Sequence, residues 1–218
     1  MLSEQRHEMI LKILEEKRSV TVTELTELLG ISESTARRDI IVLDKAGRLV
    51  KVFGGAVRMD HIYQSVEPTV TQKAEVNKEE KKRIARYAAS LIEPQDFVYL
   101  DAGTTTGYML DFVETANVTF VTNAVAHAQK LAAKGAHVVL IGGTLKSSTE
   151  AVVGAMAALT LKDYHFTKGF FGTNGVSRTA GFTTPDESEA LMKSTAIEQF
   201  RKAYVLCVNS KFHVISAV

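Results

Sequence analysis

The sequence contains a single cysteine, Cys207, so its 218 residues cannot form an intramolecular disulfide. This shortage favours a reducing cytoplasm over secretion as the location of the protein. The six histidines are scattered and no two have the spacing of a metal-binding pair, so we expect no metal site and no bound cofactor. Cys207 follows an apolar stretch without an adjacent base, which indicates a core residue and not a nucleophile.

An excess of one charge sign and long hydrophobic runs are also absent. The chain has 26 Lys and Arg against 25 Asp and Glu, a net charge of +1, so any DNA-binding surface must be local. No apolar run approaches the roughly 20 residues of a membrane-spanning helix, and the N-terminus lacks the apolar core of a signal peptide. We therefore expect no membrane partner. An apolar fraction of 45% is typical of globular proteins, and the length allows one or two domains.

The first 30 residues predict two amphipathic helices. Apolar residues at helical spacing between charged neighbours indicate a helix from Ser3 to about Lys17. Thr21 and Glu24 have the spacing of a capping box, which opens a second helix. Gly30 ends this helix, because glycine readily adopts the left-handed conformation that follows a helix.

A third helix follows after a turn of only three residues. Ser32 can cap it, and it extends from residue 33 to about residue 46. Two short helices joined by so short a turn form a helix-turn-helix. Arg37 and Arg38 lie near the start of the third helix, where a recognition helix contacts base edges and phosphates.

Residues 48–58 predict a β-hairpin wing. An alternating stretch, the pair Gly54-Gly55 and a short return strand are typical of a hairpin. Residues 34–58 contain six basic and two acidic residues, whereas residues 1–33 contain four basic and seven acidic ones. The predicted DNA contacts are Ser32, Ser34, Thr35, Arg37, Arg38, Arg48, Lys51 and Arg58. The alternative is a small helical domain with solvated surface arginines.

The rest of the chain predicts a linker and an α/β domain. Residues 59–76 lack a sustained period and are interpreted as a linker, partly ordered at most, and residues 77–218 as a second domain. In the second domain, apolar strands alternate with helices, which favours a parallel sheet covered on both faces. The expected strands are residues 97–101, 118–122, 137–141, 168–172 and 203–208.

Polar and glycine-rich residues gather after these strands, where ligands bind in such folds. The loop from Gly103 to Thr106 opens a helix and suits a phosphate, although it matches neither a P-loop nor a dinucleotide-binding motif. The lysines among the candidates are either countercharges or solvated surface residues. Acid–base catalysis by Asp101, Glu187 or Glu189 is the alternative to hydrogen bonding or capping. The candidate effector-binding residues are Asp101, Gly103, Thr104, Thr105, Thr106, Thr122, Asn123, Gly142, Gly143, Lys146, Asn174, Gly175, Glu187, Lys193 and Lys211.

Several motifs in one order resemble the DeoR family of bacterial transcription regulators. They are VTVTELTELLGISESTARRDIIVLDKAGRLVKVFGGAV near the N-terminus and, after it, YLDAGTTT, FVTNAV, IGGTLK, VGAMA, FFGTNGV, GFTTPDESEALMK and NSKF. The resemblance covers nearly the whole chain. It implies a winged helix-turn-helix followed by a sensor domain similar to ribose-5-phosphate isomerase. It further implies an oligomeric repressor of sugar-utilisation genes that responds to a phosphorylated sugar.

The residues of this family carry over by position. Arg37 and Arg38 match its paired recognition-helix arginines. The sensor motifs match at Asp101, Gly103, Thr104, Thr105, Thr122, Asn123, Gly142, Gly143 and Lys193.

Three features depart from the family pattern. Phe53 stands where histidine is common in the wing, and Val208 where an acidic residue often precedes the Ser-Lys motif. The chain also stops soon after Lys211, where family members usually continue, so a truncated or short sensor domain is expected.

We therefore expect a two-domain repressor that binds double-stranded operator DNA as a homo-oligomer and responds to a phosphorylated sugar. It is not expected to be an enzyme. A sugar-phosphate isomerase with an added N-terminal domain is the alternative, and a winged helix that binds protein instead of DNA is another.

Overall fold

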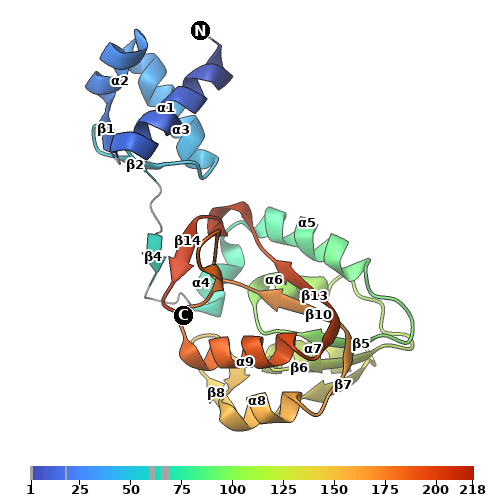
Figure 1. The fold of residues 1–218 in the computed structure, drawn as a ribbon. Coiled ribbons are helices and arrows are strands. Elements are labelled where there is room, and N and C mark those ends of the chain that lie inside the picture. Colours follow the sequence, from blue (N-terminus) through green and yellow to red (C-terminus); the bar gives the residue numbers. More distant parts are fainter. Residues whose placement is uncertain (1, 18, 59–61, 65–68) are drawn as a thin grey trace. The chain divides into compact units, whose positions relative to one another are not determined.

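A computed structural model describes residues 2–17, 19–58, 62–64 and 69–218 (Figure 1). The chain divides into two compact units, residues 1–62 and 63–218. Of the predicted linker, residues 59–61 and 65–68 lie outside the described residues. Its last part contains a short helix, α4, that begins with a capping box of Thr69 and Gln72.

The first unit packs three helices against a small antiparallel sheet (Figure 1). Its elements are α1 (Ser3–Lys17), β1 (Ser19–Thr21), α2 (Val22–Leu29), α3 (Glu33–Lys45), β2 (Val50–Val52) and β3 (Gly55–Val57). Its core consists of apolar side chains from all three helices and the segments between them: Ile10, Leu14, Val20, Leu25, Ala36, Ile40, Leu43 and Leu49.

Local hydrogen bonds fix the predicted helix-turn-helix. The Oγ1 atom of Thr21 accepts from the amide of Glu24 at 3.1 Å, and the Glu24 carboxylate accepts from the amide of Thr21 at 2.8 Å. Gly30 ends α2 with φ 62° and ψ 39°. Ser32 caps α3 by accepting from the amide of Thr35. These capping predictions are confirmed.

The wing is a hairpin of β2 and β3, completed by β1 on the outer side of β3. Gly55 pairs with both Thr21 and Val52, and a Cβ atom there would lie 2.2 Å from the carbonyl oxygen of Val20. The position therefore requires glycine. Gly54 has φ 79°, so the turn also needs a residue that tolerates a left-handed backbone.

The second unit is a three-layer α/β domain. Its helices are α4 (Val70–Glu75), α5 (Lys78–Ala89), α6 (Thr104–Met109), α7 (Val125–Ala133), α8 (Ala155–Leu161), α9 (Glu187–Ile197) and the 3₁₀ turn η1 (Asn209–Lys211). Its strands are β5 (Phe97–Leu100), β6 (Thr119–Thr122), β7 (His137–Leu140), β8 (Thr144–Lys146), β9 (Ala151–Val153), β10 (Phe166–Gly172), β11 (Gly175–Ser177), β12 (Gly181–Thr183), β13 (Phe200–Leu206) and β14 (Val214–Ser216). The short strand β4 (Ile62–Gln64) lies at the division between the units.

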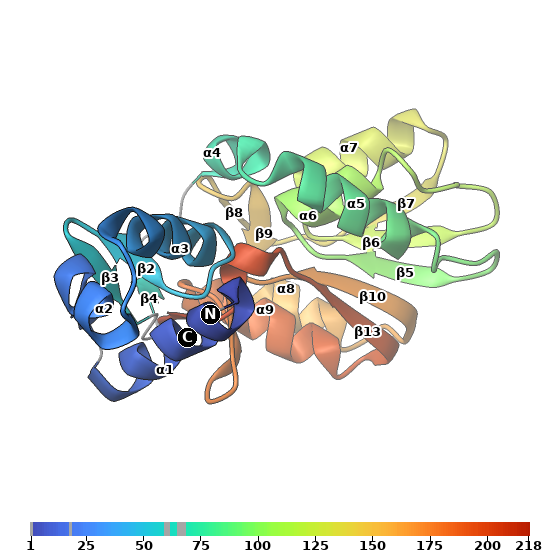
Figure 2. The same ribbon diagram turned by 90° about the horizontal axis from the view of Figure 1, so that it is seen from above.

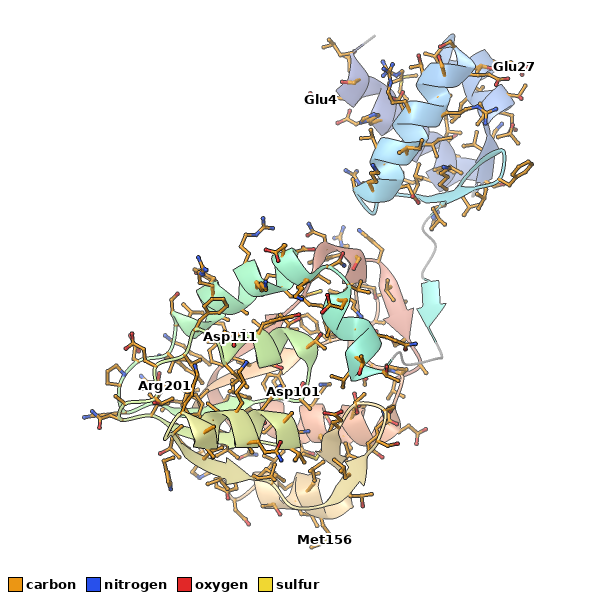
Figure 3. All side chains as sticks on the ribbon, turned by 180° about the vertical axis from the view of Figure 1, so that it is seen from behind. Glu4, Glu27, Asp101, Asp111, Met156 and Arg201 are labelled. Carbon is orange, nitrogen blue, oxygen red and sulfur yellow. The ribbon has the colours of Figure 1, made fainter. Side chains whose placement is uncertain are left out.

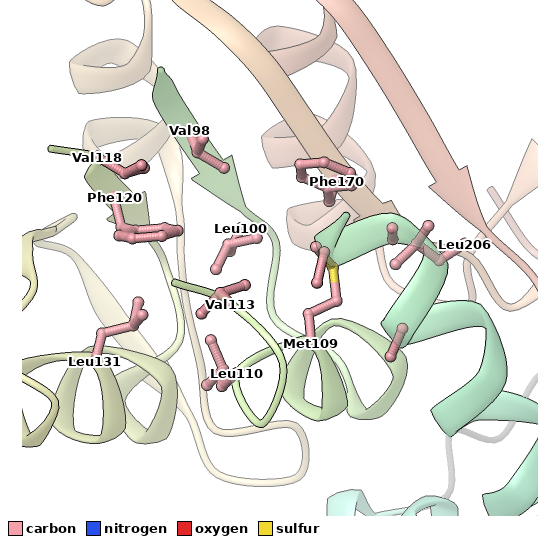
Figure 4. Close-up of a cluster of buried hydrophobic side chains, with 13 residues drawn as sticks. Val98, Leu100, Met109, Leu110, Val113, Val118, Phe120, Leu131, Phe170 and Leu206 are labelled. Carbon is pink, nitrogen blue, oxygen red and sulfur yellow. The ribbon is translucent and has the colours of Figure 1, made fainter. Parts of the chain in front are cut away.

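Five of these strands form a parallel sheet in the order β13-β10-β5-β6-β7. Helices α5, α6 and α7 cover one face, and α8 and α9 cover the other (Figure 2). On the first face, side chains of β5, α6 and β10 converge on a buried hydrophobic cluster that includes Leu100, Met109 and Phe170 (Figure 4). The other face contains a group of aromatic rings around Tyr99 and Phe166.

Several short elements were not predicted. The strands of the hairpins β8–β9 and β11–β12 span three residues each and the helix α8 spans Ala155–Leu161, so these elements are too short to produce a sustained periodic pattern. Helix α6 begins at Thr104, inside the stretch expected to be a loop. The predicted parallel sheet with helices on both faces is confirmed.

Candidate functional site

The N-terminal half of α3 presents two exposed arginines. Arg37 donates to the carboxylate of Glu33 at 3.0 Å, with both side chains more than half exposed. Arg38 is exposed and has no hydrogen bond or ion pair within the described part of the chain. An exposed ion pair costs little to break, so both guanidinium groups are available to a ligand.

The hydroxyls predicted beside these arginines have mainly local partners. The Oγ atom of Ser32 lies 2.9 Å from the hydroxyl oxygens of both Ser34 and Thr35 and caps the helix. An ion pair on the buried face of α3 joins this helix to α1. The carboxylate of buried Asp39 accepts a hydrogen bond from Nε of Arg6 at 2.5 Å. The orientation of α3 within the first unit is therefore held by its buried side.

The predicted wing contacts lie in two different places. Lys51 and Arg48 are exposed, and the amide of Lys51 donates to Asp44 at 2.8 Å. Lys51 and Arg37 line one shallow groove between the wing and α3. Arg58, in contrast, donates to the carbonyl oxygen of Glu15 at 3.1 Å, so it faces the end of α1.

In the second unit, the polar centre lies between the carboxyl ends of β5 and β10. This is the switch point of the sheet, where the chain turns from β5 toward β6 on one side and β10 toward β13 on the other. Asp101 follows β5 and is 2% exposed, and Figure 3 shows it inside the unit. Its carboxylate accepts from the amide of Gly172 at 3.1 Å and from Lys193 of α9. Burial raises the pKa of Asp101, although the Lys193 ammonium opposes this shift.

A polar cavity opens at this centre. Six predicted residues line it: Gly103, Thr104, Thr105, Asn174, Lys193 and Lys211. Residues that the sequence analysis did not select complete it: Val70, Lys73, Lys81, Ala102, Thr149, Gly172, Thr173, Glu189, Leu206 and Val208. Four lysines therefore face one cavity, against one lining carboxylate.

Three of these lysines are close to one another. Lys81 is only 6% exposed and donates to the carbonyl oxygen of Lys73. Burial lowers the pKa of Lys81, and the charges of Lys211 and Lys73 lower it further. An arrangement of partly buried ammonium groups is stabilised by a bound anion.

One signal in the sequence would have identified Lys81. It lies four residues before Ala85 and seven before Ala88, on the buried stripe of α5. A lysine on an apolar stripe is unusual unless it has a partner. Lys73 gave no comparable signal, because the segment around it was interpreted as a linker.

Other predicted effector residues lie outside the lining and support the loops. Thr106 donates to the carbonyl oxygen of Asp101 at 2.7 Å, and Thr122 to that of Leu100 at 2.6 Å. Asn123 accepts from the amide of Ala102 at 2.9 Å and donates to Val152 at 3.1 Å.

The remaining predicted residues have structural contacts. Lys146 pairs with Glu189 at 3.0 Å and Asp186 at 3.1 Å. Gly175 packs so closely on β14 that a Cβ atom would lie 2.4 Å from the carbonyl oxygen of Val214. Gly142 and Gly143 precede β8, and Glu187 begins α9 beside a second, apolar hollow.

Two further observations concern metal sites and membrane-spanning helices. Among the described residues, no three His, Cys, Asp or Glu side chains are grouped so that they could hold a metal ion. None of the described helices has the length and apolar character needed to cross a membrane.

Comparison with known proteins matches both units. Residues 6–61 match the DeoR-like helix-turn-helix domain, and residues 76–218 match the DeoR C-terminal sensor domain. A protein of Bacillus subtilis (strain 168) named "Uncharacterized HTH-type transcriptional regulator FruR" is 44% identical over 99% of this chain and 86% of its own. The lactose phosphotransferase system repressor of Streptococcus mutans is 33% identical over 97% of this chain and 84% of its own.

Among solved structures, ribose 5-phosphate isomerase A from Methanocaldococcus jannaschii is similar over 62% of this chain and 55% of that chain. The sequence identity is 15% and the TM-score 0.47, so this likeness supports no conclusion about activity. Both family matches and the repressor relatives agree with the order of the motifs and with the two units of the fold. The chain belongs to the DeoR family of helix-turn-helix transcriptional regulators.

Proposed function

We propose that this regulator is a repressor of sugar-metabolism genes whose operator binding is modulated by a phosphorylated sugar held in the lysine-lined cavity. The observation that carries the effector proposal is the convergence of Lys73, Lys81, Lys193 and Lys211 on one cavity. The name of one relative, the lactose phosphotransferase system repressor of Streptococcus mutans, supports a role in sugar metabolism.

The lining of the cavity offers two kinds of chemistry. The ammonium groups of Lys73, Lys81 and Lys211 suit a dianionic phosphate. Thr149, Thr173 and Asn174 bring hydroxyl and amide groups to the lining, which suit the hydroxyls of a sugar. We assign the phosphate to the three lysines and the sugar to the polar residues beside Asp101.

We further propose that the chain has no isomerase activity and acts as a homo-oligomer. In the free protein the Asp101 carboxylate has Lys193 and the amide of Gly172 as partners. These contacts hold the Asp101 carboxylate in place. A symmetric oligomer would match the repeated half-sites that helix-turn-helix dimers bind. An assay of ribose 5-phosphate isomerisation and a measurement of mass in solution test these two statements.

The test of the effector is thermal unfolding of the full chain with glucose 6-phosphate, fructose 1-phosphate, fructose 6-phosphate, ribose 5-phosphate and inorganic phosphate. Unphosphorylated glucose and fructose are the matched ligand controls. A ligand at 100 times its dissociation constant should stabilise the protein by about 2.7 kcal/mol. Lys211→Gln should lose most of this response, whereas Lys202→Gln, at an exposed position of β13, should keep it.

The active compound should also release the protein from DNA. If unphosphorylated sugars stabilise the protein equally well, or if the Lys211 variant responds like the wild type, the assignment of the phosphate is wrong.

A further inference from the structure

The short helix α4 forms part of the wall of the lysine-lined cavity, but the core of the second unit does not fix it. The helix has six residues, and none of its side chains is buried. A helix of this length is not stable by itself in water, so α4 depends on contacts with its neighbours. Val70 and Lys73 of this helix line the cavity. One wall of the proposed anion site is therefore formed by a weakly held element.

The contacts that dock α4 are hydrogen bonds to its backbone. The hydroxyl of Tyr108 donates to the carbonyl oxygen of Ala74 at 3.0 Å, and the ammonium group of Lys81 donates to that of Lys73. The first amide of the helix donates to the carbonyl oxygen of Ser148 at 3.1 Å. Water can replace each of these partners when the helix moves away, so their net contribution to docking is small.

Like charges oppose this docking. Burial lowers the pKa of Lys81, and the positive charges of Lys211 and Lys73 lower it further, because the three ammonium groups repel one another. An anion among them replaces this repulsion by attraction. Only docked α4 presents Lys73 to such an anion. The anion therefore has a higher affinity for the docked state, which is the condition for a ligand to shift a conformational equilibrium.

Helix α4 also lies where the two units are joined along the chain. The division falls between residues 62 and 63, and α4 is the first helix after it. Asn77, which precedes α5, has a left-handed backbone with φ 55°, and its side-chain amide donates to Ser210 of η1 at 2.9 Å. This contact holds the junction between α4 and α5. A movement of α4 about the junction displaces the segment that leads along the chain to the first unit.

We propose that α4 is an anion-dependent strap, which docks on the cavity when a phosphate group is bound between Lys73 and Lys211 and loosens when the phosphate leaves. The inference rests on the proposed function and identifies the element that links effector binding to the first unit. Because α4 follows the segment between the units, its docking restricts the conformations open to that segment. The docked state is the one that releases DNA.

Amide hydrogen exchange of the full chain, read by mass spectrometry with and without inorganic phosphate, tests the strap. Relative to sodium chloride of equal ionic strength, saturating phosphate should slow the exchange of residues 69–76 by a factor of about five or more. Residues 102–105, which line the same cavity, should also be protected. Exchange in α7, residues 125–133, should stay unchanged.

A substitution outside the cavity lining separates docking from direct anion contact. Tyr108→Phe removes the hydrogen bond to Ala74. It should speed the exchange of residues 69–76 in the phosphate-free protein about fivefold, the factor that corresponds to one hydrogen bond. It should raise the dissociation constant for phosphate by up to the same factor, because docking and anion binding are coupled. Tyr87→Phe, at a 70% exposed position of α5, is the matched control and should change neither.

The possible outcomes distinguish the strap from the anion site itself. Phosphate that protects residues 102–105 but not residues 69–76 would overturn the strap and keep the anion site. Faster exchange of α4 in Tyr108→Phe with an unchanged dissociation constant for phosphate would also overturn it, because α4 would then be a passive wall. Absence of protection at both places would refute the lysine cavity as the anion site, and the strap with it.

Discussion

Replacing Lys81 by methionine separates the role of this lysine in the folded protein from its role in anion binding. Its side chain is 6% exposed and its ammonium donates to the carbonyl oxygen of Lys73. Removing that donor costs about 1 kcal/mol. Removing a buried charge that is crowded by Lys211 and Lys73 gains a similar amount.

The two effects oppose each other, so the ligand-free variant should stay within about 1 kcal/mol of the wild type. Ligand binding should change much more. A charge-assisted hydrogen bond to phosphate contributes about 2 kcal/mol, so its loss raises the dissociation constant about 30-fold. At a concentration 100 times the wild-type dissociation constant, ligand stabilisation should fall from about 2.7 to about 0.9 kcal/mol.

The assay is chemical or thermal unfolding of Lys81→Met with and without the active sugar phosphate. Lys82→Met is the matched control, because Lys82 is the next residue on the same helix, is 39% exposed and pairs with Glu79 outside the cavity. It should keep the full ligand response. If Lys81→Met keeps the response, or if Lys82→Met loses it equally, the lysine cavity is not the anion site.

Three other substitutions test separate parts of the molecule. Arg38→Ala should weaken operator binding by about 1–3 kcal/mol if the guanidinium reads a base. Arg83 of α5 is exposed and serves as the control, because Arg83→Ala should not weaken operator binding. Gel-shift titration measures both affinities. Burial lowers the pKa of His127 to about 4, so the stability due to its neutral ring is complete above the unfolded pKa near 6.5 and is lost as the pH falls toward 4. The loss should reach about 3 kcal/mol, and pH-dependent unfolding should show a flatter profile for His127→Gln. In Gly169→Ala, the new Cβ atom would lie 2.3 Å from the ring of Phe200, so equilibrium unfolding should show a loss of about 1–3 kcal/mol; unchanged stability would mean that the ring moves freely.

The first unit could be predicted from the sequence in detail. Its helix ends depend on side chains three residues from the amides they cap, as with Thr21 and Glu24, and on the left-handed backbone of Gly30. Interactions of this range are visible in a linear sequence, because neighbouring residues cannot be far apart in space. The wing followed for the same reason, although its third strand, β1, did not, since the pairing of Val20 with Ala56 joins distant segments.

The candidate effector site could be predicted only in part. The polar ends of the strands predicted Gly103, Thr104, Thr105 and Asn174, which line the candidate cavity, because parallel strands place their carboxyl ends at one edge. Other residues of the same motifs, among them Thr106 and Thr122, use their hydroxyls to support the backbone. A sequence motif does not show on which side of a loop a hydroxyl group lies.

The sequence by itself determined the helix-turn-helix and the parallel sheet, because these depend on local spacing and on the periodicity of apolar residues. It also indicated the family, because several of its motifs, in one order, resemble those of that family. The tertiary structure alone decided which lysines share a cavity. Lys73 and Lys81 come from the segment before β5, whereas Lys193 and Lys211 follow β12 and β13, more than 100 residues later. Only the packing of α4 against α6, and of α5 against α6 and β13, brings these charges together, and such long-range packing leaves no periodic signal in the chain.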